Sequence, residues 1–345
     1  MRRVVVVGGT GFFGAAALAL LRDAGVSAMS AARRNADLAV DAESPDSLRR
    51  ALRPGDVVLD AAGPFQSRST ALAEAAIEIG CEVVDIADAS AYVRRVLSLA
   101  ERAAEAGVRI LPACSTASAV SHAMIAWSGV ARPTGLTAFL VPTPRYTAVP
   151  GTAASLLAGV GGPAMVLRDG APRSERGFGS SRRWGNGTPL GARRGWLLDT
   201  PDALLLPRSH PTLATVEAYV DPNVTGAAMA LAFAARSTVV RAVMRRALPV
   251  ALPLARRLGG AHGGFGCEVE DADGGVARLV LTAPRDSHLL AVIPAVLAVR
   301  ALADGRVPHA GILAPHQQID DAELLDELRR RGFDLHRSAT SSTER

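Results

Sequence analysis

The sequence predicts an α/β protein built on a doubly wound parallel sheet. Three observations lead to this prediction. Short apolar runs alternate with helical patterns over the first 115 residues, the connections between them are short, and a glycine-rich loop joins the first run to the first helix. The run at 4–7 is Val-Val-Val-Val and has no polar face, which is typical of a strand buried on both sides of a Rossmann sheet.

The elements of this first part follow from apolar periodicity and from helix start and stop signals. A helix is expected at 14–24, where Gly25 ends it, and another at 46–52, where Ser44 supplies a cap. The remaining elements are strands at 26–31, 57–61, 83–86 and 108–112, and helices at 70–79 and 91–106.

The pattern then changes to that of an α+β region. Residues 159–200 are rich in Gly, Arg, Pro and Ser and are expected to form loops with a few short strands. A long helical stretch at 226–257 is expected to break near Pro249 and Pro253, with its apolar residues in the core and its charges outside. The other expected elements are strands at 135–142, 267–269 and 276–283, helices at 151–157, 289–303 and 320–330, and a disordered tail at 337–345.

Composition limits the function. The chain has 345 residues, 49% of them hydrophobic and 21% charged, which excludes disordered, collagenous and coiled-coil proteins and allows two domains. All 38 basic residues are Arg. A chain without lysine cannot use a Schiff base, a P-loop lysine or the Tyr-x-x-x-Lys pair of short-chain dehydrogenases.

Charge, cysteine and hydropathy patterns indicate a soluble cytoplasmic protein. The formal charge is +5, but the arginines are scattered and no nucleic-acid-binding motif accompanies them, so we expect no nucleic-acid partner. Cys81, Cys114 and Cys267 lie far apart, which predicts neither a metal site nor a disulfide framework. No apolar stretch reaches the roughly 18 residues of a membrane span, and Gly8–Gly11 interrupts the apolar N-terminal run that resembles a signal peptide.

The strongest functional motif is Gly9-x-Gly11-x-x-Gly14, placed between a strand and a helix. Glycines at this spacing allow a tight turn, close approach of a pyrophosphate and close packing of helix on strand. The motif predicts a dinucleotide site formed by Gly8, Gly9, Thr10, Gly11, Phe12, Phe13 and Gly14. The alternative is an ordinary glycine turn.

The end of the second strand favours NADP over NAD. It has no acidic residue for a ribose hydroxyl, whereas Arg33 is placed to bind a 2′-phosphate, with Ser30 and Arg34 as helpers. The alternative is a pair of solvated arginines. After the third strand, small residues would let the dinucleotide pass, and we expect it to contact Ala62, Gly63, Pro64 and Phe65.

Several of these segments together resemble the NADP-binding domain of the saccharopine-dehydrogenase-like oxidoreductases. They include 4–14, the Gly-Pro-Phe of 63–65, Gly80 with Asp85, and the Gly-Thr-x-x-Ser of 151–155. The resemblance implies a dinucleotide-binding domain at 1–130, an inserted α+β substrate domain at 131–288, and C-terminal helices at 289–336 that pack back on the first domain. The chain departs from the family where Asp88-Ala89-Ser90 replaces Gly-Glu. The resemblance also implies a Lys–His pair in the lysine-forming members, and because this chain has no lysine, we do not expect saccharopine as its substrate.

Hydride transfer requires a proton donor beside the cofactor. The main candidates are Asp88, His122 and Tyr146, and His210 and Tyr219 are further candidates. Each has a structural alternative, as a packed histidine or an interface aromatic, and Cys114 is more readily a buried thiol than a nucleophile. Trp184 and Trp196 are expected either to line a substrate pocket or to lie on a mobile lid.

The sequence thus predicts an NADP(H)-dependent oxidoreductase that reduces a small C=N, C=O or activated C=C substrate held between two domains. The alternatives are a catalytically silent NADP-binding sensor or scaffold and an atypical short-chain-dehydrogenase-like protein. The stretch at 226–257 leaves open a homodimer through the second domain or docking on a membrane surface.

Overall fold

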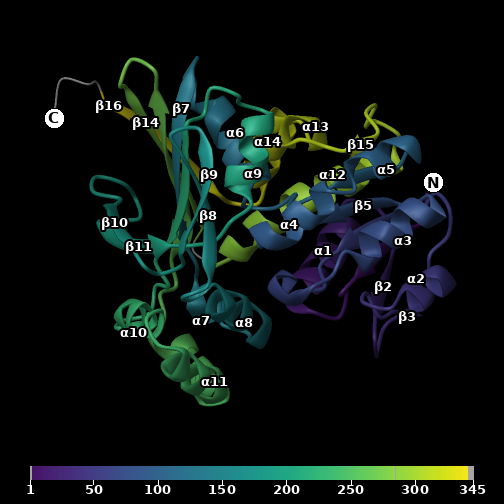
Figure 1. The fold of residues 1–345 in the computed structure, drawn as a ribbon, viewed down its shortest axis with the longest axis horizontal. Coiled ribbons are helices and arrows are strands. Elements are labelled where there is room, and N and C mark those ends of the chain that lie inside the picture. Colours follow the sequence, from purple (N-terminus) through teal and green to yellow (C-terminus); the bar gives the residue numbers. More distant parts are fainter. Residues whose placement is uncertain (1, 284, 341–345) are drawn as a thin grey trace. The chain divides into compact units, whose positions relative to one another are not determined.

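The computed structural model describes residues 2–283 and 285–340, which form two compact units (Figure 1). The first unit comprises the chain up to residue 120 together with 289–324. The second comprises 121–288 and the described residues from 325 onward. No helix in the described ranges is long and apolar enough to cross a membrane.

The first unit contains a parallel seven-stranded sheet in the order β15-β6-β5-β4-β1-β2-β3. The chain runs outward from β1 to β2 and β3, then returns to lay down β4, β5 and β6 on the other side, which makes the sheet doubly wound. Every residue of β1, β4 and β5 is buried, which confirms the burial predicted for the run at 4–7. The strands are β1 Val4–Val7, β2 Ala28–Ala32, β3 Leu38–Ala39, β4 Val57–Asp60, β5 Glu82–Asp85, β6 Arg109–Leu111 and β15 Gly311–Ile312.

The helices of this unit begin and end largely at the expected signals. Ser44 caps α2 by accepting a hydrogen bond from the N–H of Ser47, and Gly80 ends α3 in the left-handed conformation. The helix expected at 91–106 is in fact two, α4 and α5. Helix α12 packs on α1, β4 and β5. The helices are α1 Phe12–Asp23, α2 Pro45–Ala51, η1 Phe65–Ser67, α3 Ala71–Ile79, α4 Ser90–Leu97, α5 Ala100–Glu105, α12 Ile293–Ala303 and α13 Pro315–Gln318, and η3 Ser287–Ala291 spans the boundary between the two units.

The second unit contains a mixed sheet with the strand path β10-β11-β12-β7-β13-β14-β16, to which β8 and β9 attach through β12. At 159–200, where loops with a few short strands were expected, four short strands, β8 to β11, are present, and the expectation that they would be a minor feature of this stretch was wrong. The tail expected from 337 was also wrong as far as residue 340, since β16 pairs with β14 to that point, and 341–345 lie outside the described residues. The strands are β7 Pro133–Val141, β8 Pro163–Arg168, β9 Ala171–Arg176, β10 Ser181–Trp184, β11 Arg193–Leu197, β12 Thr215–Val220, β13 Gly263–Asp271, β14 Val276–Ala283 and β16 Asp334–Thr340.

The long helical stretch breaks at a different place from the one expected. Helix α11 continues through both Pro249 and Pro253, and the break falls before it, at Ser237, whose hydroxyl caps α11 by accepting from the N–H of Val240. The remaining helices are α6 Ala119–Ser128, α7 Pro144–Thr147, α8 Pro150–Gly159, α9 Asp202–Leu205, η2 Leu206–Arg208, α10 Ala227–Ala234, α11 Thr238–Leu258 and α14 Asp321–Arg330.

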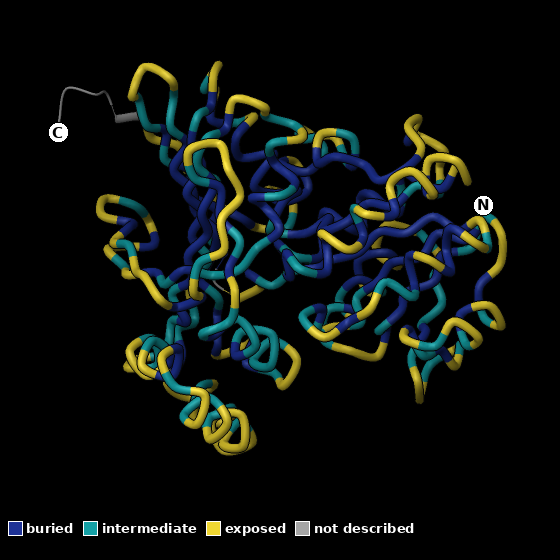
Figure 2. The backbone as a smooth tube through the Cα atoms, viewed as in Figure 1, coloured by how far each residue is buried: buried dark blue, intermediate teal, exposed yellow. Residues whose placement is uncertain are grey.

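Aromatic stacking fills the core on one face of the second sheet. The ring of Phe139 stacks on Trp184 at 4.8 Å and on Tyr219 at 5.6 Å. A Cβ at Gly266 would lie 2.1 Å from the Trp184 ring, so the glycine makes room for the indole. Figure 2 shows the strands of this sheet as mainly buried, whereas much of α11 is exposed.

Candidate functional site

The glycine loop between β1 and α1 is packed so tightly that most of its glycines are required by the loop itself. Gly8 has a φ of +79° and donates its N–H to the carbonyl of Ala31 at 2.8 Å. A Cβ at Gly9 would lie 2.9 Å from the carbonyl oxygen of Val6, and one at Gly14 would lie 2.1 Å from that of Gly8. These three positions therefore need glycine whether or not a ligand binds.

Gly11 is different, because it is exposed and its backbone is extended at φ −83° and ψ 173°. A Cβ there would approach only the carbonyl oxygen of Gly8, at 3.1 Å. Gly11 is also the N-cap of α1, where no side chain caps the helix and no acidic residue lies in the first turn. This end of α1 thus presents its N–H groups and positive dipole to an anion, as a pyrophosphate site requires.

Gly11→Ala and Gly14→Ala should therefore separate binding from folding. We expect Gly14→Ala to destabilise the protein by about 3 kcal/mol, because its Cβ meets fixed backbone. Gly11→Ala should cost less than about 1 kcal/mol of stability but weaken dinucleotide binding at least tenfold. Denaturant unfolding and fluorescence titration with NADPH measure the two effects. Unchanged NADPH affinity in Gly11→Ala would mean that the phosphate does not approach this residue.

The end of β2 holds an acidic residue that the sequence analysis did not place there. Both the N–H and the hydroxyl of Ser30 donate to Oδ2 of Asp37 at 2.8 Å, and the N–H of Asp37 donates to the Ser30 hydroxyl at 3.0 Å. These hydrogen bonds, led by that from the Ser30 side chain, lower the pKa of Asp37. Ser30, which is expected to help bind a 2′-phosphate, is therefore hydrogen-bonded to a carboxylate at the same place.

Arg33 and Arg34 follow β2 directly and are both exposed. Within the described part of the chain, neither guanidinium forms a hydrogen bond or an ion pair with another residue. The same strand end thus offers two unpaired cations and one carboxylate, a combination that suits either a 2′-phosphate or a ribose diol.

The segment after β4 has one residue with room for a ligand and one that points into the core. A Cβ at Gly63 would meet its first neighbour, the N atom of Phe65, only at 3.9 Å, so the fold does not require glycine there. The Gly63–Pro64 peptide is cis. Phe65, which is expected to contact the dinucleotide, is 4% exposed, and its ring lies 5.1 Å from that of Tyr92, so it packs in the core of the unit.

A buried cluster of charged side chains contacts the backbone of this segment. Asp60 and Asp85 end the adjacent strands β4 and β5 and are paired in register. Arg68 lies beside Asp60 with Nη2 3.2 Å from Oδ2, donates to the carbonyl of Ala62, and also binds Glu43. Burial raises the pKa of Asp60, and the charge of Arg68 opposes that shift.

Asp85 is the more unusual of the two carboxyls. Its Oδ1 accepts hydrogen bonds from the N–H groups of Ala87 and Ala113, at 3.0 and 2.7 Å. Its Oδ2 is buried and has no hydrogen-bond partner among the described residues. Burial raises the pKa of Asp85 to about 7, and the neighbouring Asp60 adds to the shift. This carboxyl can therefore change its charge near neutral pH.

The structure brings two of the proton-donor candidates together. His122 on α6 and His210 after η2 are 88 residues apart, yet Nδ1 of His122 lies 2.8 Å from Nε2 of His210. Because one nitrogen must donate and the other accept, the pair shares one proton along this contact. The His122 side chain is buried and His210 is half-buried, so the second ring is the more accessible.

The other candidates have different surroundings. Asp88 belongs to the first unit and accepts a hydrogen bond from Nε2 of Gln66 at 3.1 Å. Tyr146 is 40% exposed on α7. Tyr219 is buried and donates to Glu217 at 2.6 Å; burial and this hydrogen bond raise its pKa. Cys114 is fully buried, which raises the pKa of its thiol and fits the structural role.

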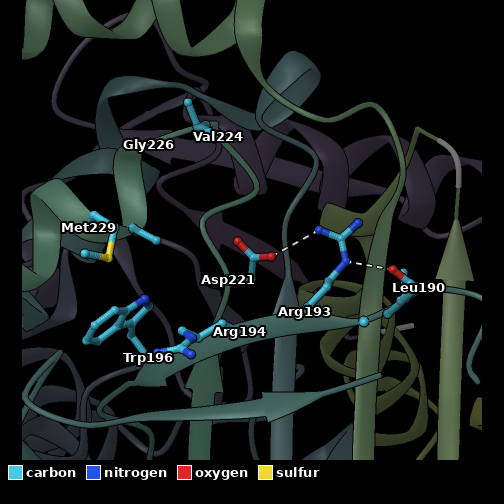
Figure 3. A pocket seen from close by; sticks show the side chains of 10 residues that line it. Leu190, Arg193, Arg194, Trp196, Asp221, Val224, Gly226 and Met229 are labelled. Carbon is cyan, nitrogen blue, oxygen red and sulfur yellow. Dashed lines mark hydrogen bonds and ion pairs between the residues drawn. The ribbon is translucent and has the colours of Figure 1, made fainter. Parts of the chain in front are cut away.

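Trp184 and Trp196 lie in different surroundings. Trp184 is a core residue, whereas Trp196 borders an open pocket of about 520 Å³ together with Arg193, Arg194 and Met229 (Figure 3). In this pocket Arg193 is paired with Asp221 at 3.1 Å. Arg194 is exposed and lies beside the Trp196 ring.

Sequence reasoning missed Asp37, Arg68 and the pairing of Asp60 with Asp85. One signal for the pair was present, since the buried runs of β4 and β5 read Val-Val-Leu-Asp and Glu-Val-Val-Asp. Parallel neighbours end at the same edge of a sheet, so two terminal aspartates in adjacent strands must meet. No comparable pattern in the sequence indicates that Arg68 would pair with Asp60.

Comparison with known proteins finds a family model that matches residues 4–111 and solved structures that share the fold. Residues 4–111 match the family described as the saccharopine dehydrogenase NADP binding domain. The structure resembles apo saccharopine dehydrogenase (L-Glu forming) from Saccharomyces cerevisiae over 99% of this chain and 100% of that one, with a TM-score of 0.58 and 14% identity. At this identity the likeness shows the fold alone.

Two further solved structures are similar at lower scores. Myo-inositol 2-dehydrogenase from Lactobacillus plantarum matches over 95% of this chain and 96% of its own, with 8% identity and a TM-score of 0.44. GenD2 from gentamicin A biosynthesis, in complex with NAD, matches over 99% and 97%, with 13% identity and a TM-score of 0.42. No curated protein matches the sequence.

Proposed function

We propose that this chain, whose residues 4–111 match the saccharopine dehydrogenase NADP binding domain, is an NADP(H)-dependent oxidoreductase. Its substrate would be a small molecule with a C=N, C=O or activated C=C bond. The observation that carries the proposal is the open end of α1, where the exposed Gly11 and the uncapped helix suit a pyrophosphate. Gly63 adds to it, because the fold leaves room at that position that a passing dinucleotide would use.

The residues of this chain would bind, orient and protonate, while bound NADPH would supply the hydride. The loop of 8–14 would hold the pyrophosphate, and Arg33 with Arg34 would bind the 2′-phosphate. Asp88, His122 and Tyr146 are the proposed proton donors. The hydrogen bond to His210 favours His122 among them, because a second imidazole can return the proton that the first has given away.

Arg33→Ala and Asp37→Asn test the choice between NADP and NAD. Arg33 is exposed and unpaired, so its loss should weaken NADPH binding about ten- to a hundredfold, the value of a charge-assisted contact, and leave NADH binding unchanged. Asp37→Asn removes a negative charge from the same strand end and should tighten NADPH binding. Fluorescence titration measures both affinities, with Arg50→Ala, an exposed arginine on α2, as the matched control.

The outcomes separate three cases. If Asp37→Asn instead weakens NADH binding and Arg33→Ala changes nothing, the carboxylate holds a ribose diol and the cofactor is NAD. If neither nucleotide binds the wild-type protein, the oxidoreductase proposal is wrong. If NADPH binds but no imine, ketone or enoyl thioester is reduced, the chain is a nucleotide-binding sensor or scaffold.

A further inference from the structure

Helices α10 and α11 expose apolar side chains that a water-facing helix pair would not normally carry. On α11, Val239, Val243, Val250, Leu254 and Leu258 are between 53% and 78% exposed. Their spacing of four, seven, four and four residues places them on one stripe of the helix. On α10, Met229 and Phe233 are 68% and 65% exposed and lie one turn apart. We call these seven side chains the apolar face.

The apolar face is distinct from the side of α11 that packs on the rest of the second unit. Val240, Met244 and Leu248 pack against the cluster that contains Leu157 and Phe178. The base of the helix pair is fixed by a β-bridge between Val224 and Gly259. Figure 1 shows both helices at one end of the second sheet, near α7 and α8. The expectation that the apolar residues of this stretch lie in the core therefore holds only for the inner side.

The charge around the apolar face has a single sign. Between Asp221 and Glu268 the chain has six arginines and no acidic residue. Two of them are held by the fold, Arg241 on the carbonyl of Ala235 and Arg256 on that of Ala148. The other four are exposed, and no residue in the described ranges forms a hydrogen bond or ion pair with their guanidinium groups; they are Arg236, Arg245, Arg246 and Arg257.

We propose that the apolar face docks on an anionic lipid surface, with the four arginines at the level of the head groups. Exposed apolar side chains together with arginines are the two requirements for a helix that lies in a membrane interface. Trp196 and Arg194 add a further aromatic and a further cationic side chain, in the pocket that Met229 of the apolar face also borders (Figure 3). Tryptophan favours this depth because its ring is amphipathic. A second copy of the chain fits less well, since a two-fold contact would bring two sets of arginines together.

Vesicle flotation tests this proposal with the full-length protein. The wild type should float with vesicles of phosphatidylcholine that contain 30% phosphatidylglycerol and stay behind with pure phosphatidylcholine. Arg245→Gln/Arg246→Gln/Arg257→Gln should lower the partition coefficient about a hundredfold, at about fivefold for each arginine near the surface. Val250→Asp/Leu254→Asp should abolish flotation. Both positions are exposed, so circular dichroism and the melting temperature should remain those of the wild type.

A matched variant separates local charge from net charge. Arg22→Gln/Arg50→Gln/Arg102→Gln removes the same three charges from exposed helix positions of the first unit and should float like the wild type. Failure of the wild type to float overturns the proposal, and so does equal binding to both vesicles. A dimer in light scattering that Val250→Asp/Leu254→Asp converts to a monomer, without flotation of the wild type, would assign the apolar face to a second copy instead.

Discussion

Arg68→Ala should destabilise the protein by about 3 to 5 kcal/mol at pH 7, the usual cost of removing one partner of a buried ion pair. The side chain of Arg68 is 7% exposed and that of Asp60 is fully buried. Without the guanidinium, the Asp60 carboxyl keeps, among the described residues, only the hydrogen bond from the N–H of Ala62, at 3.0 Å. A carboxylate buried in this way must either remain charged at a high cost or take up a proton.

The same substitution should loosen the segment that follows β4. Arg68 binds the carbonyl of Ala62, and its own carbonyl accepts from Nη2 of Arg95 at 2.6 Å. The guanidinium also lies 5.8 Å from the centre of the Phe65 ring. Because Gly63 lies within this segment, NADPH binding should weaken together with stability.

Urea unfolding at pH 7 and pH 5 measures the effect, which should be smaller at pH 5 because Asp60 can then accept a proton. The exposed pair of Arg49 and Glu78 provides the control, since Arg49→Ala should barely change the unfolding midpoint. Asp60→Asn/Arg68→Met removes both charges and should recover part of the lost stability. A loss of less than about 1 kcal/mol in the free energy of unfolding of Arg68→Ala would contradict a net stabilising role for the Arg68–Asp60 pair.

The parallel sheet could be predicted because burial of a strand on both faces leaves a signal within the strand's own residues. Strands covered on both faces must be continuously apolar, so β1 and β4 stand out in the sequence. The strands β9 and β10 do not, because their residues are mostly exposed and read Ala-Pro-Arg-Ser-Glu-Arg and Ser-Arg-Arg-Trp. Composition alone cannot separate such strands from loops.

The site was harder to predict than the fold because its contacts depend on register. Asp37 contacts Ser30, seven residues before it in the sequence, because the short strand β3 that follows Asp37 pairs with β2. The contact between His122 and His210 joins positions that are 88 residues apart in the sequence and follows no local pattern. The glycine motif could be identified because all of its parts lie within seven residues.

The stability of the protein should fall between about pH 4 and pH 7 because of Asp85, and Asp85→Asn should remove that loss. Burial raises the pKa of this carboxyl from 3.8 to about 7 in the folded state. Between those values the native carboxyl binds a proton that the unfolded chain has released. Raising the pH therefore favours the unfolded chain until the native carboxyl has ionised as well.

The size of the effect follows from the shift. At 1.36 kcal/mol for each pKa unit, a shift of about three units corresponds to as much as about 4 kcal/mol at pH 8. Asparagine keeps an oxygen for the N–H groups of Ala87 and Ala113 and carries no charge at any pH. The variant should thus match the wild type near pH 4 and exceed it above pH 7.

Urea unfolding at intervals from pH 4 to pH 8 would trace both curves. Asp37→Asn is the matched control, because the pKa of Asp37 is lowered in the folded state and its removal should bring no gain as the pH rises. Parallel curves for the wild type and Asp85→Asn would mean that the carboxyl is already ionised in the native state at pH 5. In that case the unpartnered Oδ2 must be stabilised by something other than the residues around it. A difference that grows with pH would identify Asp85 as a proton-binding group buried beside Asp60, at the strand ends over which the dinucleotide is proposed to pass.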